Sequence, residues 1–448
     1  MAAATRSACG KRAASSRCPR SRGPWDNAPT PPVSSPLRAL RSRNYRLFFI
    51  GQGISLIGSW MTRLATAWLV YRLTDSAFLL GVVAFASQAP SLVLPPLVGV
   101  WLDRWDRRKV LIVVQVLSMV QSLALAALTL GGVINMPWII GLSLFQGLVS
   151  AVEIPTRQAF VVRMIDDRAD LGNAIALNSS NFNATRLVGP AIAGAVVAAV
   201  GEGYCFLIDG LSYIAVIWGL LAMRLPPDER PRTVRHAGQE FREGWHYVVQ
   251  STPIRSLFIF LAAVGILSAP YSVLTPVLAG RALGGGAHTL GFLMAATGVG
   301  ALTCAVRLVL RPSVVGLGRL MAMAVAAFGV GCMALGSSQW LWLSMALMTV
   351  TGYGLMYQVV ATNTIVQTIV DDDKRGRVMS FYTIALAGSG PIGSLLGGSL
   401  AARIGVEATY AVSGGGCLLM ALWFSRQLPA IRAAVRPRYV ELGIITDA

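Results

Sequence analysis

Hydrophobic residues occur in long runs separated by short polar stretches over most of the 448-residue chain. A helix rises 1.5 Å per residue, so about twenty apolar residues are enough to cross a bilayer. A few such runs could be buried core helices of a soluble protein, but twelve could not. We predict twelve membrane spans, at Leu47–Leu73, Phe78–Leu102, Val110–Gly132, Trp138–Pro155, Ala174–Val200, Tyr204–Met223, Ser256–Leu278, Leu290–Leu310, Leu320–Leu335, Trp340–Val360, Val378–Ala402 and Thr409–Phe424.

The two halves of the chain repeat one pattern. Asp166-Asp167 follows the fourth span and Asp371-Asp372 follows the tenth, and each pair precedes a Gly-Pro pair by about twenty residues. The Gly-Pro pairs, at 189–190 and 390–391, are 201 residues apart. Internal duplication of this kind is common in secondary transporters, whose substrate path lies between the repeats. The expected fold class is an all-α membrane protein with twelve transmembrane helices in two pseudo-symmetric six-helix bundles.

The polar segments set the expected domain boundaries. Within the segment that joins the halves, Phe241, Trp245 and Val248 follow one another at helical spacing and predict an amphipathic helix on the membrane surface. The expected parts are a disordered basic tail at 1–36, a six-helix bundle at 37–224, a cytoplasmic linker at 225–254, a second bundle at 255–428 and a cytoplasmic tail at 429–448.

The charges give the expected orientation. Only 13% of residues are charged, about half the share of a typical soluble domain. The net charge of +18 could suggest a nucleic-acid partner, but 33 of the 38 Lys and Arg residues fall on one side of the twelve predicted spans. This asymmetry is the positive-inside pattern. We expect a multi-pass protein of the bacterial inner membrane with both termini cytoplasmic, and no nucleic-acid partner.

Signals of catalysis are absent from the sequence. The six cysteines and three histidines have no metal-binding spacing, and no glycine-rich phosphate loop is present. We therefore predict no enzyme activity and no cofactor. The expected driving force for transport is a proton gradient. The expected partners are a small-molecule substrate and the lipid bilayer, with the protein acting as a monomer.

Polar residues recur at helical spacing within several predicted spans. Such a stripe indicates either a wet cavity or close helix packing, and packing is the common explanation where the residues are Ser or Thr. The candidate cavity-lining residues are Gln52, Ser59, Gln146, Ser150, Asn178, Asn181, Tyr271, Tyr353, Tyr357 and Asn363.

Four charged residues, Arg63, Glu153, Arg186 and Asp209, lie within or near the predicted spans. A charge inside a membrane is a functional candidate because it is costly to place there. The two acids could neutralise the two arginines, or Glu153 could carry a proton whose binding shifts the conformational equilibrium. Glu153 is also four residues from Arg157, so a local ion pair with a structural role is the alternative.

The loop between the second and third spans, GVWLDRWDRRKV, carries six charges. It resembles the signature of the major facilitator superfamily, Gly-x-x-x-Asp-Arg-x-Gly-Arg-Arg-Lys/Arg, with Asp106 in place of the usual glycine. That departure, together with LRALRSRNYRLFFIGQGISLIGSWMTRLATAWLVYRLT and DDDKRGRVMSFY, resembles the branch of enterobactin-exporter-like efflux permeases. The matching loop residues are Gly99, Asp103, Arg104, Arg107, Arg108 and Lys109.

The resemblance implies that Asp103 and the arginines latch the cytoplasmic face while the transporter opens outward. The alternative is that these cations only fix the topology. The corresponding loop of the second half keeps Arg307 and Arg311 but has no matching acid.

The fifth predicted span partly matches the glycine-rich pattern of the superfamily's antiporters. Gly189, Pro190 and Gly194 fit that pattern, but Ala184 or Thr185 occupies the position of an earlier glycine. The resemblance implies a proton-coupled exporter of a small organic molecule such as a siderophore, drug or metabolite. An importer or lipid flippase, and a receptor or scaffold without transport, are the alternatives.

Overall fold

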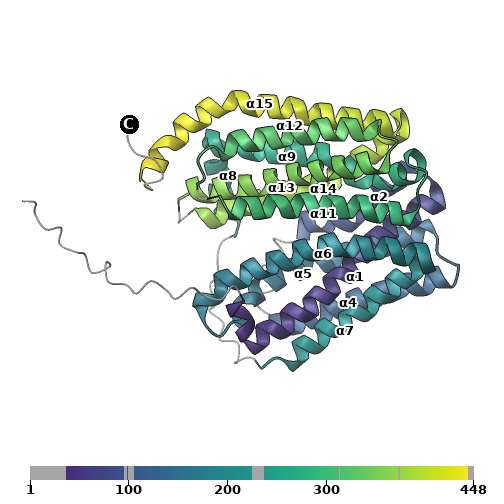
Figure 1. Ribbon diagram of the computed structural model, residues 1–448. Coiled ribbons are helices and arrows are strands. Elements are labelled where there is room, and N and C mark those ends of the chain that lie inside the picture. Colours follow the sequence, from purple (N-terminus) through teal and green to yellow (C-terminus); the bar gives the residue numbers. More distant parts are fainter. Residues whose placement is uncertain are drawn as a thin grey trace, which may run out of the picture.

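The computed structural model describes residues 37–94, 98, 105–224, 237–311, 313–371 and 374–441, without the side chains of 168 and 237–241. All regular structure in this part of the chain is helical (Figure 1). The long helices of the first half are α1 (Arg43–Thr74), α2 (Ala77–Gln88), α4 (Arg107–Leu130), α5 (Met136–Val161), α6 (Leu171–Val200) and α7 (Glu202–Ala222).

The second half begins after the linker helix α8 (Ala237–Gln250). Its first span is α9 (Thr252–Val273), which continues through the short α10 (Thr275–Val277) and a π-turn to Ala282. The remaining helices are α11 (Ala287–Val309), α12 (Leu317–Gly336), α13 (Leu341–Ile369), α14 (Arg375–Ile404) and α15 (Val406–Glu441).

Eleven helical segments of the described residues are long and apolar enough to cross a membrane. Helix α1 is not among these eleven, although it has 32 residues and packs against α6 and α7. The predicted all-helical architecture is therefore confirmed.

Several helices extend beyond their hydrophobic runs. The fourth span was expected to end at Pro155, but α5 continues to Val161. Likewise, α15 continues to Glu441, so residues 429–441 of the expected tail are helical, with Ile431 and Val435 buried. Helix ends depend on capping and packing, whereas the sequence expectation followed hydropathy.

The helices form two groups that lie side by side in Figure 1. One group holds α1 and α4–α7, and the other holds α9 and α11–α15. The groups meet where α6 packs on α11 and α2 packs on α14. They diverge toward the end at which α7 ends and α8 lies, called here the linker end.

Glycines allow the two halves to approach closely away from the linker end. A Cβ atom on Gly194 of α6 would lie 3.0 Å from the Cα of Gly291 in α11, and one on Gly81 of α2 would lie 3.0 Å from the Cα of Gly398 in α14. At the same end, the carboxylate of Asp75 pairs with the guanidinium of Arg281. The arrangement is thus closed at this end.

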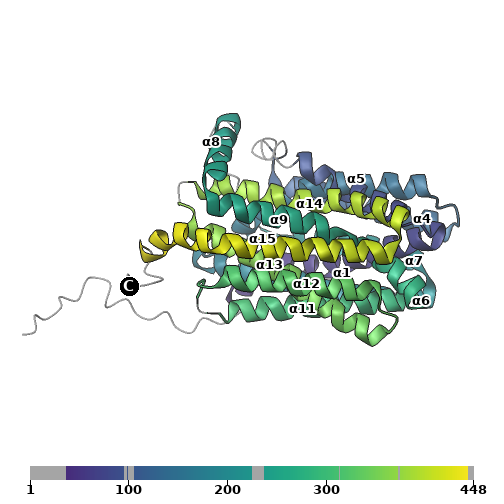
Figure 2. The ribbon, with the colours of Figure 1, turned by 90° about the horizontal axis from the view of Figure 1, so that it is seen from above.

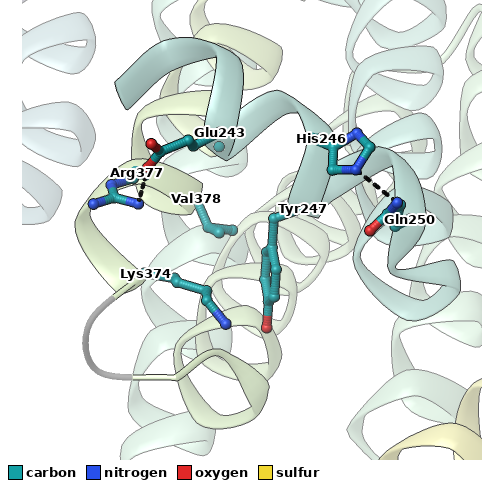
Figure 3. Close-up of a pocket in the computed structure, with 8 residues that line it drawn as sticks. Glu243, His246, Tyr247, Gln250, Lys374, Arg377 and Val378 are labelled. Atoms are coloured by element: carbon teal, nitrogen blue, oxygen red, sulfur yellow. Dashed lines mark hydrogen bonds and ion pairs between the residues drawn. The ribbon is translucent and has the colours of Figure 1, made fainter. Parts of the chain in front are cut away.

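The linker helix α8 is attached to the second half (Figure 3). Arg377 of α14 donates to Glu243 at 2.8 Å, and the Lys374 ammonium lies 4.8 Å from the ring centroid of Tyr247. The rings of Trp245 and Phe381 are 5.9 Å apart. The linker thus contains a helix, with Val248 buried and Trp245 against α14, and it packs on α9 and α14 of the second half.

The predicted orientation can be tested by labelling with a membrane-impermeant maleimide in intact cells. Ser337 is exposed at the closed end and Arg319 is exposed at the linker end. We expect Ser337→Cys to react and Arg319→Cys to stay unlabelled until the membrane is permeabilised, because the linker end carries the positive loops. Both variants need Cys9 and Cys18 replaced by Ser, and the reverse labelling pattern would contradict the orientation.

Candidate functional site

The interior of the first half contains a buried carboxylate, Asp209 of α7, which is 1% exposed. Its Oδ2 accepts hydrogen bonds from Thr62 of α1 at 2.8 Å and Ser122 of α4 at 2.7 Å. Its Oδ1 is buried without a partner, and a Cβ atom on Gly58 would lie only 2.6 Å from it. Asp209 therefore joins three helices.

The sequence analysis suggested that Asp209 could neutralise an intramembrane arginine. In the described residues, its partners are two hydroxyl groups and it makes no ion pair. Because the contacts tie α1, α4 and α7 together within one half, a role in holding the bundle explains them.

Replacing Asp209 by Ala is expected to destabilise the protein by about 2–4 kcal/mol, since it leaves two buried hydroxyl groups without their charged acceptor. Asp209→Asn keeps one acceptor oxygen and should cost less than half as much. The control is Asp75→Ala, which removes an exposed ion pair and should cost less than about 1 kcal/mol. Thermal unfolding of the purified protein checks the order, and equal losses for Asp209→Ala and Asp75→Ala would contradict it.

Glu153 of α5 is less buried and lies among polar groups. Gln115 of α4 donates to its Oε1 at 3.3 Å, and the nearest guanidinium nitrogen of Arg157 lies 3.9 Å away. The expected local pair with Arg157 is therefore present, although it is long. Because the Glu153 side chain is still 16% accessible, a proton can reach the carboxylate.

Arg63 of α1 has no carboxylate of a described residue within ion-pair distance. Its guanidinium lies 5.0 Å from the ring centroid of Trp60, and the side chain is exposed although α1 packs within the bundle. It interacts electrostatically with Glu153 and with Arg186 of α6. Two like charges without a paired acid leave a positive field that an anionic or electron-rich group can neutralise.

Arg186 extends this positive field toward the second half. It is partly exposed and lies near the neutral side chain of Tyr271 of α9, and it makes no ion pair with a described residue. The Tyr271 hydroxyl shares a 2.6 Å hydrogen bond with Thr297 of α11. Glu153, Arg63, Arg186 and Tyr271 thus lie near one another, without a hydrogen bond or ion pair between any two of them among the described residues, and are called here the charged track.

Several of the candidate cavity residues lie in the interior of the first half. Gln52 is buried with an unpartnered Oε1, and Ser59 lies 3.4 Å from the Tyr213 hydroxyl. Gln146 donates to Ser118 at 3.3 Å and lies 3.5 Å from Ser150.

Other candidates are held by contacts within one half. Asn178 accepts from Tyr45 at 3.3 Å, and Asn181 donates to the Phe49 carbonyl at 3.2 Å. Asn363 accepts from Gln367 one turn further along α13.

The sequence suggested that Tyr353 and Tyr357 line the path between the halves. They lie in a separate cavity between α11, α12 and α13, with their rings 5.9 Å apart. Both a path and a side cavity produce the same i, i+4 spacing, so the sequence could not separate them.

The sequence analysis missed the polar face of α4. Gln115, Ser118, Gln121 and Ser122 are all at most 3% exposed. The first two contact Glu153 and Gln146, Ser122 donates to Asp209, and Gln121 donates to the Leu142 carbonyl. Their spacing of three and four residues places them on one face of a helix, so the sequence contained the signal for this polar face. Tyr213 of α7 is also absent from the predicted site, although it lies four residues after Asp209 and therefore on the same face of the helix.

The loop signature is only partly within the described residues. Gly99, Asp103 and Arg104 lie outside them. Asp106 caps α4 by accepting from the backbone N–H groups of Arg108 and Lys109, which explains how an acid can stand where the superfamily has glycine.

The described cations of this loop contact the first half. Arg108 donates to the carbonyls of Leu220 and Leu221 at the end of α7, at 2.8 and 2.9 Å. Arg107 lies 3.5 Å from the Ala159 carbonyl, and Lys109 is exposed. Arg108 therefore joins α4 to α7 in this conformation.

The glycine-rich pattern of the fifth span lies within α6, which Pro190 does not interrupt. A Cβ atom on Gly189 would lie 2.5 Å from the Cβ of Trp60 in α1, and Gly194 faces Gly291 of α11. Gly189 therefore sets how closely α6 packs on α1 of its own half, and Gly194 sets how closely it packs on α11 of the other half.

Comparison with known proteins agrees with this architecture. Residues 34–439 match the family model described as transmembrane secretion effector. The chain is 24% identical to the staphyloferrin A transporter of Staphylococcus aureus, over 85% of this chain and 95% of that protein. It is 28% identical to the multidrug efflux pump Tap of Mycobacterium tuberculosis, over 80% and 86%.

Two further matches support the same conclusion. The chain is 23% identical to the enterobactin exporter EntS of Shigella boydii, over 84% of this chain and 89% of that protein. The crystal structure of the nucleoside transporter NupG has the same fold, with a TM-score of 0.67 at 14% identity, over 87% of this chain and 99% of that one. The chain belongs to the transmembrane secretion effector family of major facilitator superfamily transporters, and it is not an enzyme.

Proposed function

We propose that this transporter is a proton-coupled exporter of a small organic molecule such as a siderophore, drug or metabolite. The observation that carries the proposal is the charged track, because it places an accessible acid, Glu153, near two cationic groups on the side of the first half that is close to Tyr271 of the second. The protein would act as a monomer in the bacterial inner membrane, with both termini in the cytoplasm.

Alternating access follows from the arrangement of the halves. The glycine contacts and the Asp75–Arg281 pair close the end opposite the linker, whereas the halves diverge toward the linker end. With the linker in the cytoplasm, this conformation would receive substrate from the cell. Rocking of the halves would then expose the substrate to the other side.

Proton coupling would use Glu153. Protonation removes its negative charge and weakens its contacts with Gln115 and Arg157, which changes the field at Arg63. A ligand shifts a conformational equilibrium only by the difference in its affinity for the two states. A substrate that donates hydrogen bonds to the carboxylate would favour proton release, so substrate and proton would exchange.

The relatives guide the choice of substrates for a test. Everted membrane vesicles from expressing cells can be energised by respiration, with acridine orange fluorescence reporting the pH gradient. We expect enterobactin, staphyloferrin A or ethidium to dissipate part of the gradient, and only in vesicles that contain the protein.

The other outcomes separate the alternative functions. Uptake of these compounds into intact cells, without proton release from everted vesicles, would indicate an importer. Movement of labelled phospholipid alone would indicate a flippase. A cellular phenotype that survives Glu153→Gln, with no transport of any compound, would indicate a receptor or scaffold.

A further inference from the structure

A cavity of about 480 Å³ lies between α11, α12 and α13 of the second half. Its wall contains two arginines, Arg307 and Arg311, and neither Asp nor Glu. The remaining wall is mostly apolar, with Leu308, Leu320 and Met323 among its residues. A positive end beside an apolar wall fits a molecule that is itself anionic at one end and apolar at the other.

The cavity faces away from the first half. Helix α11 contacts α6 through Gly291 and Gly298. Arg307 comes nine residues after Gly298, which is two and a half helical turns and places it on the opposite face of α11. Figure 2 shows α11 and α12 along one lateral edge of the molecule. The cavity is therefore separate from the charged track.

The side of the cavity lies where lipid would surround the protein. Met323 is 54% exposed and Val350 is 43% exposed, and both line the cavity. Arg307 is two residues from the end of α11 and Arg311 is just beyond it, at the linker end. The guanidinium groups thus lie at the depth of lipid headgroups, and the apolar wall extends toward the acyl chains.

The polar groups of the cavity have unused bonding capacity. Arg311 donates through Nε to the Ser313 carbonyl at 2.8 Å and through Nη2 to the Val315 carbonyl at 2.6 Å, which fixes its guanidinium and leaves Nη1. Arg307 makes no hydrogen bond or ion pair with a described residue and is exposed. Tyr357 is 4% exposed, and its buried hydroxyl group has no partner among the described residues.

We propose that this cavity binds the headgroup of an anionic phospholipid from the leaflet at the linker end. The phosphodiester accepts hydrogen bonds from Arg307, Arg311 and the Tyr357 hydroxyl, and the acyl chains lie against the exposed apolar wall. Basic cavities between transmembrane helices on the cytoplasmic side are suited to such headgroups. This inference is independent of the direction of transport and of its coupling to protons.

The test uses the full-length protein in a neutral detergent, with native mass spectrometry to count bound lipids. We expect dioleoylphosphatidylglycerol to bind about tenfold more tightly than dioleoylphosphatidylcholine, since both lipids offer an ionised phosphodiester but the cationic choline of phosphatidylcholine is repelled by the two arginines. Arg307→Gln should remove this preference. The matched control is Arg319→Gln, which removes an exposed arginine at the same end of the molecule, outside the cavity.

Two further variants keep both arginines. Tyr357→Phe deletes only the unpartnered hydroxyl and should weaken phosphatidylglycerol binding about threefold. Ala327→Phe places a ring at an exposed position of the cavity wall and should block binding while α12 stays folded. Circular dichroism and gel filtration of each variant separate loss of binding from loss of fold.

Two results would overturn the proposal. If Arg307→Gln and Ala327→Phe bind phosphatidylglycerol as the wild type does, the lipid does not occupy this cavity. If millimolar inorganic phosphate displaces the lipid completely, the ligand of the cavity is a free anion and not a lipid headgroup.

Discussion

Glu153→Gln is expected to abolish transport driven by a pH gradient, with at least a hundredfold loss of rate, while the protein stays folded. Glutamine keeps the size of the side chain and can still bond with Gln115, but it cannot bind or release a proton. Removing a group that transfers a proton typically lowers the rate of the step that it serves by about a hundredfold or more. The measurement is substrate-dependent proton release in vesicles of known protein content.

A second assay separates coupling from substrate binding. Exchange of labelled for unlabelled substrate across the membrane, without a gradient, needs the conformational change but no net proton movement. We expect Glu153→Gln to retain this exchange. The matched control is Glu407→Gln, which removes an exposed acid at the closed end and should leave both assays unchanged. If Glu153→Gln loses both the exchange and the gradient-driven transport, the role of Glu153 is structural, through its pair with Arg157.

Gly194→Leu is expected to reduce transport at least tenfold by preventing the halves from closing. A Cβ atom at this position would lie 2.9 Å from the Ala287 carbonyl oxygen and 3.0 Å from the Cα of Gly291. The leucine side chain cannot fit unless α6 and α11 move apart, because interiors at native packing density hold no spare volume. The control is Gly141→Leu on α5, where nothing lies within 4 Å of the added Cβ.

A cross-link can report the closed end directly. Cysteines that replace Asp75 and Arg281, which are ion-paired in this conformation, should form a disulfide under mild oxidation. We expect Gly194→Leu to lower the yield and Gly141→Leu to leave it unchanged. An unchanged yield in Gly194→Leu would show that the α6–α11 contact does not control closure.

The sequence predicted the fold well because hydropathy and charge asymmetry are strong signals in membrane proteins. It could not predict where helices end. The hydrophobic run of α5 ends near Pro155, but the helix continues to Val161. Residues 429–441 likewise prolong the last helix, because their burial depends on neighbouring helices.

The candidate site was predicted less completely. Glu153, Arg63 and Arg186 were found because charge within an apolar run is conspicuous. The hydroxyl partners of Asp209 were not found, since they come from α1 and α4, and spacing within one helix says nothing about another. The position of Tyr353 and Tyr357 in a side cavity depends on the packing of three helices.

The attachment of α8 to α14 has a mechanical consequence for the transport cycle. Since the Glu243–Arg377 pair and the Trp245–Phe381 contact bind it to one half, α8 should travel with that half as a single rigid body. Only the twelve residues between Arg224 and Ala237 then tether one bundle to the other. Fully stretched, they reach at most about 40 Å, which leaves the bundles free to tilt.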